Sequence, residues 1–182
     1  MLKKILVCLD GSKFAEELIP YAIDRATHFN SKIVLFKVIN SNVSPYLFSL
    51  PGVAGQSATS IPVITQTQLD SMIRGDEVET RLYLENVATR LRKVGLDVEA
   101  VAWRRAAGDG IADAIVTYAA GNEVDLIMMA AHRFSFWKRI IYGSVTESVI
   151  RNTAVPVLVI NPQSEMTNAG SLDEMPQASL TC

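Results

Sequence analysis

MMAAHRFSFWKRIIYGSVTESV, residues 128–149, leads from the end of an apolar run through a basic and aromatic linker to the start of a helical pattern. The apolar run, Val124–Ala130, has the length and composition of a buried strand. Ser144 is followed three residues later by Glu147, which predicts a capping box at the start of a helix over Ser144–Asn152. A buried strand, a loop and a helix in this order are typical of α/β proteins.

The same alternation runs through the rest of the chain. Apolar runs predict strands at Lys4–Leu9, Lys32–Ile39, Asp97–Trp103, Val124–Ala130 and Val155–Ile160. Helical spacing predicts helices from Ser12, as N-cap, to Phe29, and over Leu69–Val94, Gly108–Gly121 and Ser144–Asn152. We therefore predict one α/β domain over residues 1–161, a three-layer, doubly wound, Rossmann-like fold with a five-stranded parallel sheet and four main helices.

Composition and charge exclude several classes of function. The formal net charge of −2 over 182 residues gives no bulk attraction for nucleic acid. No segment approaches the roughly 20 apolar residues of a membrane span, and the first residues lack the apolar core of a secretion signal. We therefore expect a cytoplasmic protein. Its two cysteines, Cys8 and Cys182, predict no structural disulfide, and Cys8 is expected to be a buried small apolar residue.

Two segments fall outside the alternation. Residues 40–68 carry no charged side chain and hold three prolines together with Tyr46, Leu47 and Phe48. A connection of this length is usually functional or disordered, so it is either a lid or dimer arm or a poorly ordered insertion. Residues 162–182 are polar and predict a disordered tail.

Polar residues follow the predicted strands at the edge where doubly wound sheets bind ligands. Asp10 either makes the turn after the first strand or faces a ligand or divalent cation. Ser144 either caps the last helix or, with Gly143 and the free amides of the first turn, cradles a phosphate. His132 follows the fourth strand, where a lone histidine is more often structural than catalytic.

Motifs of common enzyme classes are absent from the sequence. It has no Walker pattern, no Gly-x-Gly-x-x-Gly after a strand, and no Gly-x-Ser-x-Gly elbow. Two histidines and two cysteines, far apart in the chain, are too few for a metal cluster. We therefore expect no catalytic residues and no resident metal.

Three segments resemble the universal stress proteins: KKILVCLDGS (residues 3–12), FKVIN (36–40), and the stretch from VDLIMMAAH through YGSVTESVIRNTAVPVLVI (124–160). The resemblance covers Leu2–Ile160. It implies a five-stranded parallel α/β domain that binds ATP or AMP in many members and serves in sensing or regulation. It also implies a homodimer through the final strand, here Val155–Ile160, whose open edge a partner would cover.

Nucleotide-binding members of this family share Gly-x-x-Gly-x9-Gly-[Ser/Thr], whose glycines fall here at Ala130, Arg133 and Gly143. Arg133 either blocks the phosphates or pairs with them. The resemblance implies a site for ATP or AMP, with Mg²⁺ beside Asp10 if the ligand is ATP. Its residues would be Asp10, Ser12, Val38, Met129, Ala130, His132, Arg133, Gly143, Ser144, Val145 and Thr146.

Two functions follow from the resemblance. The first is a homodimeric stress-response sensor that binds ATP or AMP and is at most a weak ATPase. The second is a dimeric interaction module that has lost the nucleotide, as the replaced glycines suggest. Either function implies a protein partner that the sequence does not identify, and neither requires nucleic acid or a membrane span.

Overall fold

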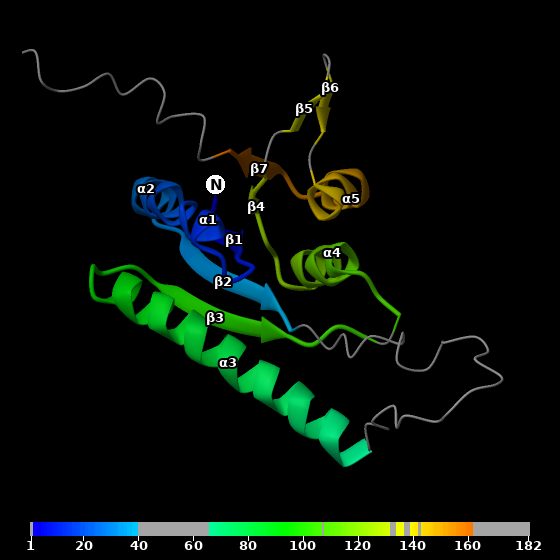
Figure 1. Cartoon of the computed structure of the whole chain (residues 1–182). Coiled ribbons are helices and arrows are strands. Elements are labelled where there is room, and N and C mark those ends of the chain that lie inside the picture. Colours follow the sequence, from blue (N-terminus) through cyan, green and yellow to red (C-terminus); the bar gives the residue numbers. More distant parts are fainter. Residues whose placement is uncertain are drawn as a thin grey trace, which may run out of the picture.

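Five parallel strands form the central sheet of the molecule (Figure 1). The computed structural model describes residues 2–39, 66–106, 108–131, 134–136, 139–141 and 143–161. The predicted tail, residues 162–182, lies outside these ranges. Residues 40–65 of the predicted insertion also lie outside them, whereas its last residues, 66–68, begin a described helix. The elements are β1 (Lys4–Cys8), α1 (Lys13–Glu16), α2 (Ile19–Phe29), β2 (Lys32–Val38), α3 (Gln66–Arg92), β3 (Val98–Trp103), α4 (Ile111–Gly121), β4 (Leu126–Ala130), β5 (Phe134–Phe136), β6 (Arg139–Ile141), α5 (Ser144–Asn152) and β7 (Val157–Ile160).

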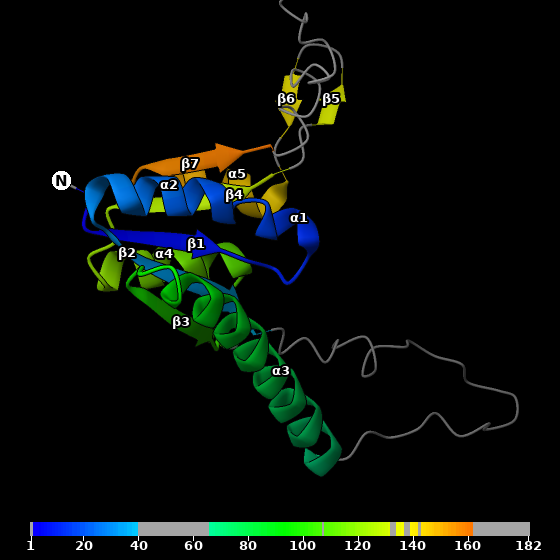
Figure 2. The same ribbon diagram turned by 90° about the vertical axis from the view of Figure 1, so that its left-hand side faces the viewer.

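The strands follow the spatial order β3-β2-β1-β4-β7 and all pairs are parallel. The chain winds outward from β1 to β2 and β3, then crosses back to build β4 and β7 on the other side of β1. Figure 2 shows the strand arrows pointing toward the same end of the molecule. The predicted doubly wound parallel sheet is confirmed, and β3 and β7 are its edge strands.

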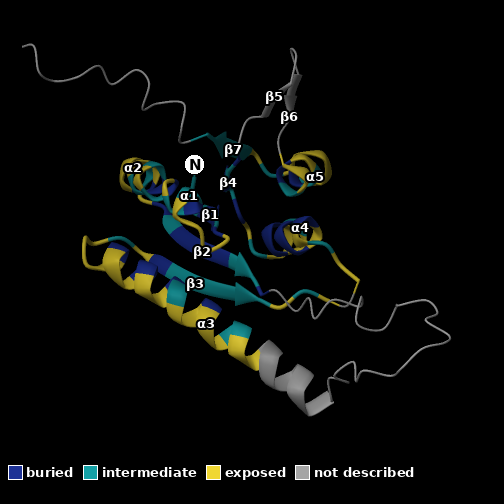
Figure 3. Ribbon diagram, viewed as in Figure 1, coloured by how far each residue is buried: buried dark blue, intermediate teal, exposed yellow. Residues whose placement is uncertain are grey.

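Buried apolar side chains pack on both faces of the sheet. Residues such as Leu18 and Leu84 bring α1, α2 and α3 onto one face, and Ile115 and Val149 bring α4 and α5 onto the other. Figure 3 shows buried stretches of the inner strands, with the edge strands β3 and β7 of intermediate burial, between helices whose outer sides are exposed. Of the helices in the described ranges, none is both long and apolar enough to cross a membrane.

The helix predicted after Ser12 is interrupted, which corrects the prediction of one continuous element. α1 ends at Glu16 and α2 begins at Ile19. Pro20, in the first turn of α2, has no amide hydrogen to donate to the carbonyl of Glu16, so the two helices cannot merge. Ser12 is the N-cap as predicted, because its Oγ accepts a hydrogen bond from the Ala15 amide at 3.1 Å.

The segment between β4 and α5 contains an antiparallel hairpin that was not predicted. Phe134 in β5 pairs with Ile141 in β6, and Phe136 pairs with Arg139. Strands of three residues are too short for an alternation of apolar and polar residues to reveal them. Part of the linker expected here therefore forms regular secondary structure.

α5 begins without the predicted capping box, so that prediction is wrong. Gly143 is the N-cap, with φ −57° and ψ 152°, and no side chain caps the first turn. The carboxylate of Glu147 accepts a hydrogen bond from Arg151 at 2.7 Å, one turn further along the helix. Because the N-cap is Gly143 and not Ser144, the helix starts one residue earlier than the motif implied, and Glu147 is one residue too far into the helix for a capping box with the N-cap.

Candidate functional site

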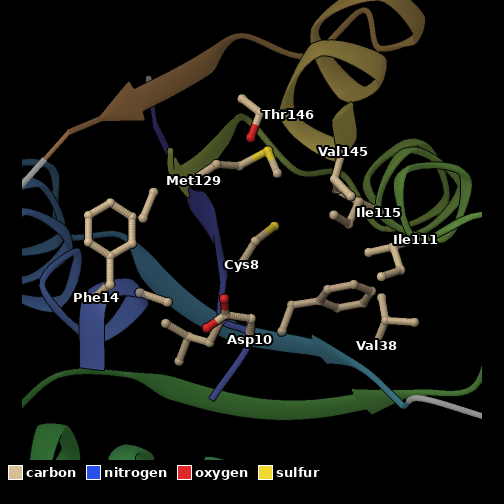
Figure 4. Close-up of a pocket in the computed structure, with 13 residues that line it drawn as sticks. Cys8, Asp10, Phe14, Val38, Ile111, Ile115, Met129, Val145 and Thr146 are labelled. Atoms are coloured by element: carbon tan, nitrogen blue, oxygen red, sulfur yellow. The ribbon is translucent and has the colours of Figure 1, made fainter. Parts of the chain in front are cut away.

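A pocket of about 280 Å³ opens at the carboxyl ends of the strands, where the strand order reverses between β1 and β4 (Figure 4). Apolar side chains make up its lining except for Cys8, Asp10 and Thr146. The lining residues are Cys8, Leu9, Asp10, Phe14, Ala15, Phe36, Val38, Ile111, Ile115, Met129, Ala130, Val145 and Thr146. Such a lining favours a largely apolar ligand group that is oriented by few polar contacts.

The register of the sheet brings the floor of the pocket together. Cys8 pairs with Phe36 of β2 and with Met129 of β4, so the three side chains stand on the same face of the sheet. The ring of Phe36 is buried and packs against Tyr118 of α4, with 4.8 Å between ring centroids. Trp103 contacts Tyr118 edge-on at 5.2 Å. An aromatic cluster on this face of the sheet therefore fixes the ring of Phe36 in place.

Asp10 follows β1 at the pocket. Its Oδ1 accepts a hydrogen bond from the amide of Ser12 at 2.8 Å, which fixes the turn that leads into α1. Figure 4 shows its carboxylate facing the pocket. The turn role and the ligand role considered from the sequence are thus compatible in one conformation. Within the described chain no group of three or more His, Cys, Asp or Glu side chains could hold a metal ion.

α5 presents its first turn to the pocket through Val145 and Thr146. Thr146 is only 4% exposed, and its hydroxyl points into the pocket in Figure 4. Amides in the first turn of a helix lack carbonyl partners and carry partial positive charge, which favours an anion. Apart from its chain neighbours, no described atom lies within 4 Å of the position where a Gly143 side chain would begin. Among the described atoms, the space beside the Gly143 α-carbon is therefore unfilled.

The thiol of Cys8 is free and half-buried. Desolvation by burial raises the pKa of this thiol from 9.0 to about 12. It is therefore a neutral thiol at physiological pH, and it behaves as the small apolar side chain that was predicted. Unlike the prediction, however, it belongs to the pocket as well as to the sheet.

The structure gathers part of the predicted site. Six of its residues line the pocket: Asp10, Val38, Met129, Ala130, Val145 and Thr146. Ser12, Gly143 and Ser144 are close to lining residues in the chain but do not line the pocket themselves. His132 and Arg133 lie outside the described residues. The two interpretations of Arg133, as a residue that blocks the phosphates or pairs with them, therefore both stay open.

Ala130 fits the position of the family's first glycine without strain. It is the last residue of β4, and the non-glycine residues with positive φ in the described chain are Asn30 and Glu123. A methyl group at a β-strand residue of negative φ requires no unusual backbone conformation. The first of the two replaced glycines is therefore no obstacle to the local fold.

Sequence-based prediction missed the apolar residues that give the pocket its shape, above all Cys8, Phe14, Phe36, Ile111 and Ile115. One signal was available for Phe36, which lies two residues before Val38 and therefore on the same face of the strand. No such signal marked Ile111 or Ile115. They line the pocket because α4 packs beside the end of β2, a contact that no local pattern specifies.

The comparisons with known proteins agree with this architecture. The sequence model of the universal stress protein family matches residues 1–161. The chain is 31% identical over 164 residues to the universal stress protein MJ0577 of Methanocaldococcus jannaschii, covering 88% of this chain and 95% of that protein. The solved structure of MJ0577 aligns with a TM-score of 0.63 at 26% identity, covering 88% of this chain and 96% of that one.

Two further solved structures share the fold at lower identity. A universal stress family protein from Arabidopsis thaliana with AMP bound has a TM-score of 0.55 and 13% identity, and the alignment covers 92% of this chain and 97% of that one. The universal stress protein from Archaeoglobus fulgidus in complex with dAMP has a TM-score of 0.55 and 19% identity, with 88% and 98% covered. The family match over nearly the whole described domain, and the fold that goes with it, lead to one conclusion: this chain belongs to the universal stress protein family.

Proposed function

We propose that this protein binds an adenine nucleotide, AMP or ATP, in the pocket between β1, β4 and the start of α5, and that it acts in the cytoplasm as a sensor or regulator. The observation that carries the proposal is the position of this pocket at the reversal of strand order, lined by six of the residues that the sequence singled out. We expect binding without efficient turnover, because the pocket lining holds no evident pair of base and nucleophile.

Each part of a nucleotide has a complementary part of the pocket. The apolar side chains around Phe36, Val38 and Ile115 suit the faces of a purine base. The Asp10 carboxylate suits ribose hydroxyl groups, which are hydrogen-bond donors. The first turn of α5 at Thr146 suits a phosphate. With ATP, a Mg²⁺ ion bound to the phosphates would have Asp10 as its nearest acid in the pocket lining.

Relatives of the same fold support this choice of ligand. One solved structure is described as holding AMP and another dAMP, and a third universal stress protein was solved in complex with cAMP. At their identities, between 13% and 19%, the likeness establishes only the fold, so the ligand of the present chain is our inference. What these ligands share is an adenosine unit, the part that an apolar pocket with one carboxylate would recognise.

Calorimetric titration of the full-length protein with AMP, and with ATP plus Mg²⁺, tests the proposal. We expect saturable binding with a dissociation constant in about the micromolar to millimolar range. Ile111→Glu should weaken it about tenfold or more, because Ile111 lines the pocket at 37% exposure and a carboxylate there would lose its hydration when the base covers it. Val78→Glu is the matched control, since Val78 on α3 is 56% exposed and does not line the pocket. Absence of binding heat with both ligands up to millimolar concentration would contradict the proposal.

A dimer through β7 is the second part of the proposal. β7 is an edge strand with half-buried side chains, so its outer backbone groups are open for pairing with a second copy. Light scattering should give a dimer for the wild type and a monomer for Val159→Lys, with Ile150→Lys on exposed α5 as control. A wild-type protein that is still monomeric at about 100 µM would count against the proposed dimer.

The alternative function, an interaction module without nucleotide, rests on Arg133 at the position of the family's second glycine. A β-carbon and a long side chain at such a position would restrict the approach of a phosphate. Recovery of AMP or ATP from protein purified without added ligand would exclude this alternative.

A further inference from the structure

Lys37 of β2 lies behind the pocket, on the other face of the sheet. Its neighbours Phe36 and Val38 line the pocket, so strand alternation directs Lys37 toward the face covered by α3. There its Nζ lies 5.3 Å from the centroid of the Tyr83 ring, within the range of a cation–π interaction. None of the ion pairs within the described chain involves Lys37, so this half-buried ammonium group rests on an aromatic face.

The ammonium group also touches the turn that carries Asp10. A β-carbon added to Gly11 would lie 2.9 Å from Lys37 Nζ, so the amino group occupies the space directly beside the Gly11 backbone. Gly11 has φ +93°, a conformation that side chains rarely adopt. From within, the turn is held by hydrogen bonds from the Ser12 amide to Asp10 and from the Ala15 amide to Ser12 Oγ. The Lys37 amino group lies against the outer side of the same turn.

The charges around this contact favour a cation. The hydroxyl of Tyr83 is buried and makes no hydrogen bond of normal geometry within the described chain. Burial, followed by the negative charges of Glu16 and Asp10, raises the pKa of Tyr83, so the ring stays a neutral phenol. Asp10 therefore interacts electrostatically with Tyr83, the residue on whose ring Lys37 lies. Of the nearby cations, Arg90 is paired with Glu16 at 3.2 Å, which leaves Lys37 to face the turn.

We propose that Lys37 is a positioning residue for the pocket: seated on the Tyr83 ring, its ammonium group packs against Gly11 and holds the turn of residues 10–12 so that Asp10 faces the ligand. Lys37 does not line the pocket, so it acts through the turn and makes no contact with the ligand. The link to ligand affinity rests on the proposed nucleotide function, whereas the link to the turn does not. By the same contact, α3 is coupled to the pocket through Tyr83.

The test compares Lys37→Met, which keeps the length but removes the charge, with Lys37→Arg and with Lys93→Met. Lys93 is an exposed lysine beyond the end of α3 and serves as the matched control. Amide hydrogen exchange is measured over residues 10–16 of the full-length protein without ligand, and the affinity for AMP is measured by calorimetry. Lys37→Met should speed exchange in the turn by about 2–10-fold and weaken AMP by a similar factor, the range expected for loss of a partly buried cation–π contact. Lys37→Arg should keep both the exchange rate and the AMP affinity close to those of the wild type, and Lys93→Met should change neither.

Exchange in the turn that is equal in wild type, Lys37→Met and Lys93→Met would overturn the inference. A wild-type protein that does not bind AMP or ATP would refute the proposed function alone, because the exchange measurement needs no ligand. If Lys37→Met does not fold, Tyr83→Leu and Tyr83→Phe take its place. Leucine removes the aromatic face and should loosen the turn, whereas phenylalanine keeps the face and should not. Equal exchange in these two variants would also overturn the inference.

Discussion

Cys8 and Met129 are directly paired in the register of β1 and β4, the two strands between which the strand order reverses. Both side chains line the pocket, and the sulfur of Cys8 points into it in Figure 4. Because the two residues are far apart in the chain, this part of the floor exists only once the sheet has assembled. The thiol therefore reports directly on the state of the pocket.

We expect Cys8 to react slowly with iodoacetamide in a Cys182→Ser background, in which it is the only thiol. At pH 8 its pKa of about 12, against 9.0 for an ordinary thiol, lowers the thiolate fraction, and the rate should fall by about tenfold or more because the greater nucleophilicity of the rarer thiolate offsets only part of the loss. AMP should slow the reaction further by covering the sulfur. Mass spectrometry of timed samples gives the rates, and alkylation as fast as that of a free thiol would contradict the buried position.

The raised pKa of Cys8 also predicts a loss of stability at alkaline pH. A folded-state pKa above 9.0 means that the folded protein holds this proton more tightly than the unfolded chain. The contribution is complete below pH 9.0 and is lost as the pH rises through the folded value. Urea unfolding between pH 8 and pH 10.5 should therefore show a smaller decline for Cys8→Ala than for the wild type. Equal declines would count against the shift.

Asp10→Asn should separate the role of Asp10 in the turn from its role in ligand binding. Asparagine can accept the same hydrogen bond from the Ser12 amide, so the melting temperature should change little. It loses the charge and one acceptor toward the pocket, and AMP affinity should fall by about tenfold, the value of one charged hydrogen bond. Asp24→Asn, on exposed α2, is the control. An unchanged affinity in Asp10→Asn would remove Asp10 from the site.

Gly143→Ala tests whether the start of α5 holds phosphate. With φ −57° and no described atom within 4 Å apart from its chain neighbours, alanine fits this position, and the free energy of unfolding should fall by no more than about 1 kcal/mol. A phosphate that packs on the backbone would meet the new methyl group, so ATP affinity should drop by about tenfold. Gly75→Ala, in an equally open position of α3, is the control. Full ATP affinity in Gly143→Ala would place the phosphates elsewhere.

Asp125 gives a prediction for acid stability. Its Oδ2 accepts hydrogen bonds from the amides of Lys3 and Lys4, at 2.7 and 2.9 Å, and these bonds lower the pKa of the carboxyl below 3.8. The contribution is present above pH 3.8 and is lost as the pH falls through the depressed folded value. Asp125→Ala should therefore destabilise the protein by about 1–2 kcal/mol at pH 7 and by less at pH 2.5. Urea unfolding at both pH values checks this, and an equal difference at both would contradict it.

Local patterns were reliable wherever one element could be identified by itself. Apolar runs such as Val124–Ala130 specify buried strands because a parallel strand is covered on both faces, and the alternation of strands with helices then specifies the doubly wound order. Gly95 stops α3 with φ +87°, as expected for a glycine after a helix. Asp10 was singled out from its place after the first strand and Thr146 from the family resemblance; both line the pocket, and their part in ligand binding stays a prediction.

The errors have local physical causes. Pro20 splits the first helix because its missing amide hydrogen outweighs the helical spacing of the apolar residues around it. The prediction of a capping box at Ser144 failed because α5 begins one residue earlier than the motif implied, and a motif alone does not fix the register of a helix start. The hairpin of β5 and β6 was too short to leave a pattern.

The sequence by itself predicted the strands and their parallel arrangement from the spacing of side chains, and it predicted the family from a resemblance in its motifs; these predictions are confirmed. The edge of the sheet at which a ligand would bind stays a prediction. Only the tertiary structure decided which side chains meet. Cys8, Phe36 and Met129 form one floor, and Lys37 rests between Tyr83 and Gly11, because strand register and helix packing join residues that are distant in sequence. Such contacts depend on the shapes of the packed surfaces, which no single segment of the chain determines.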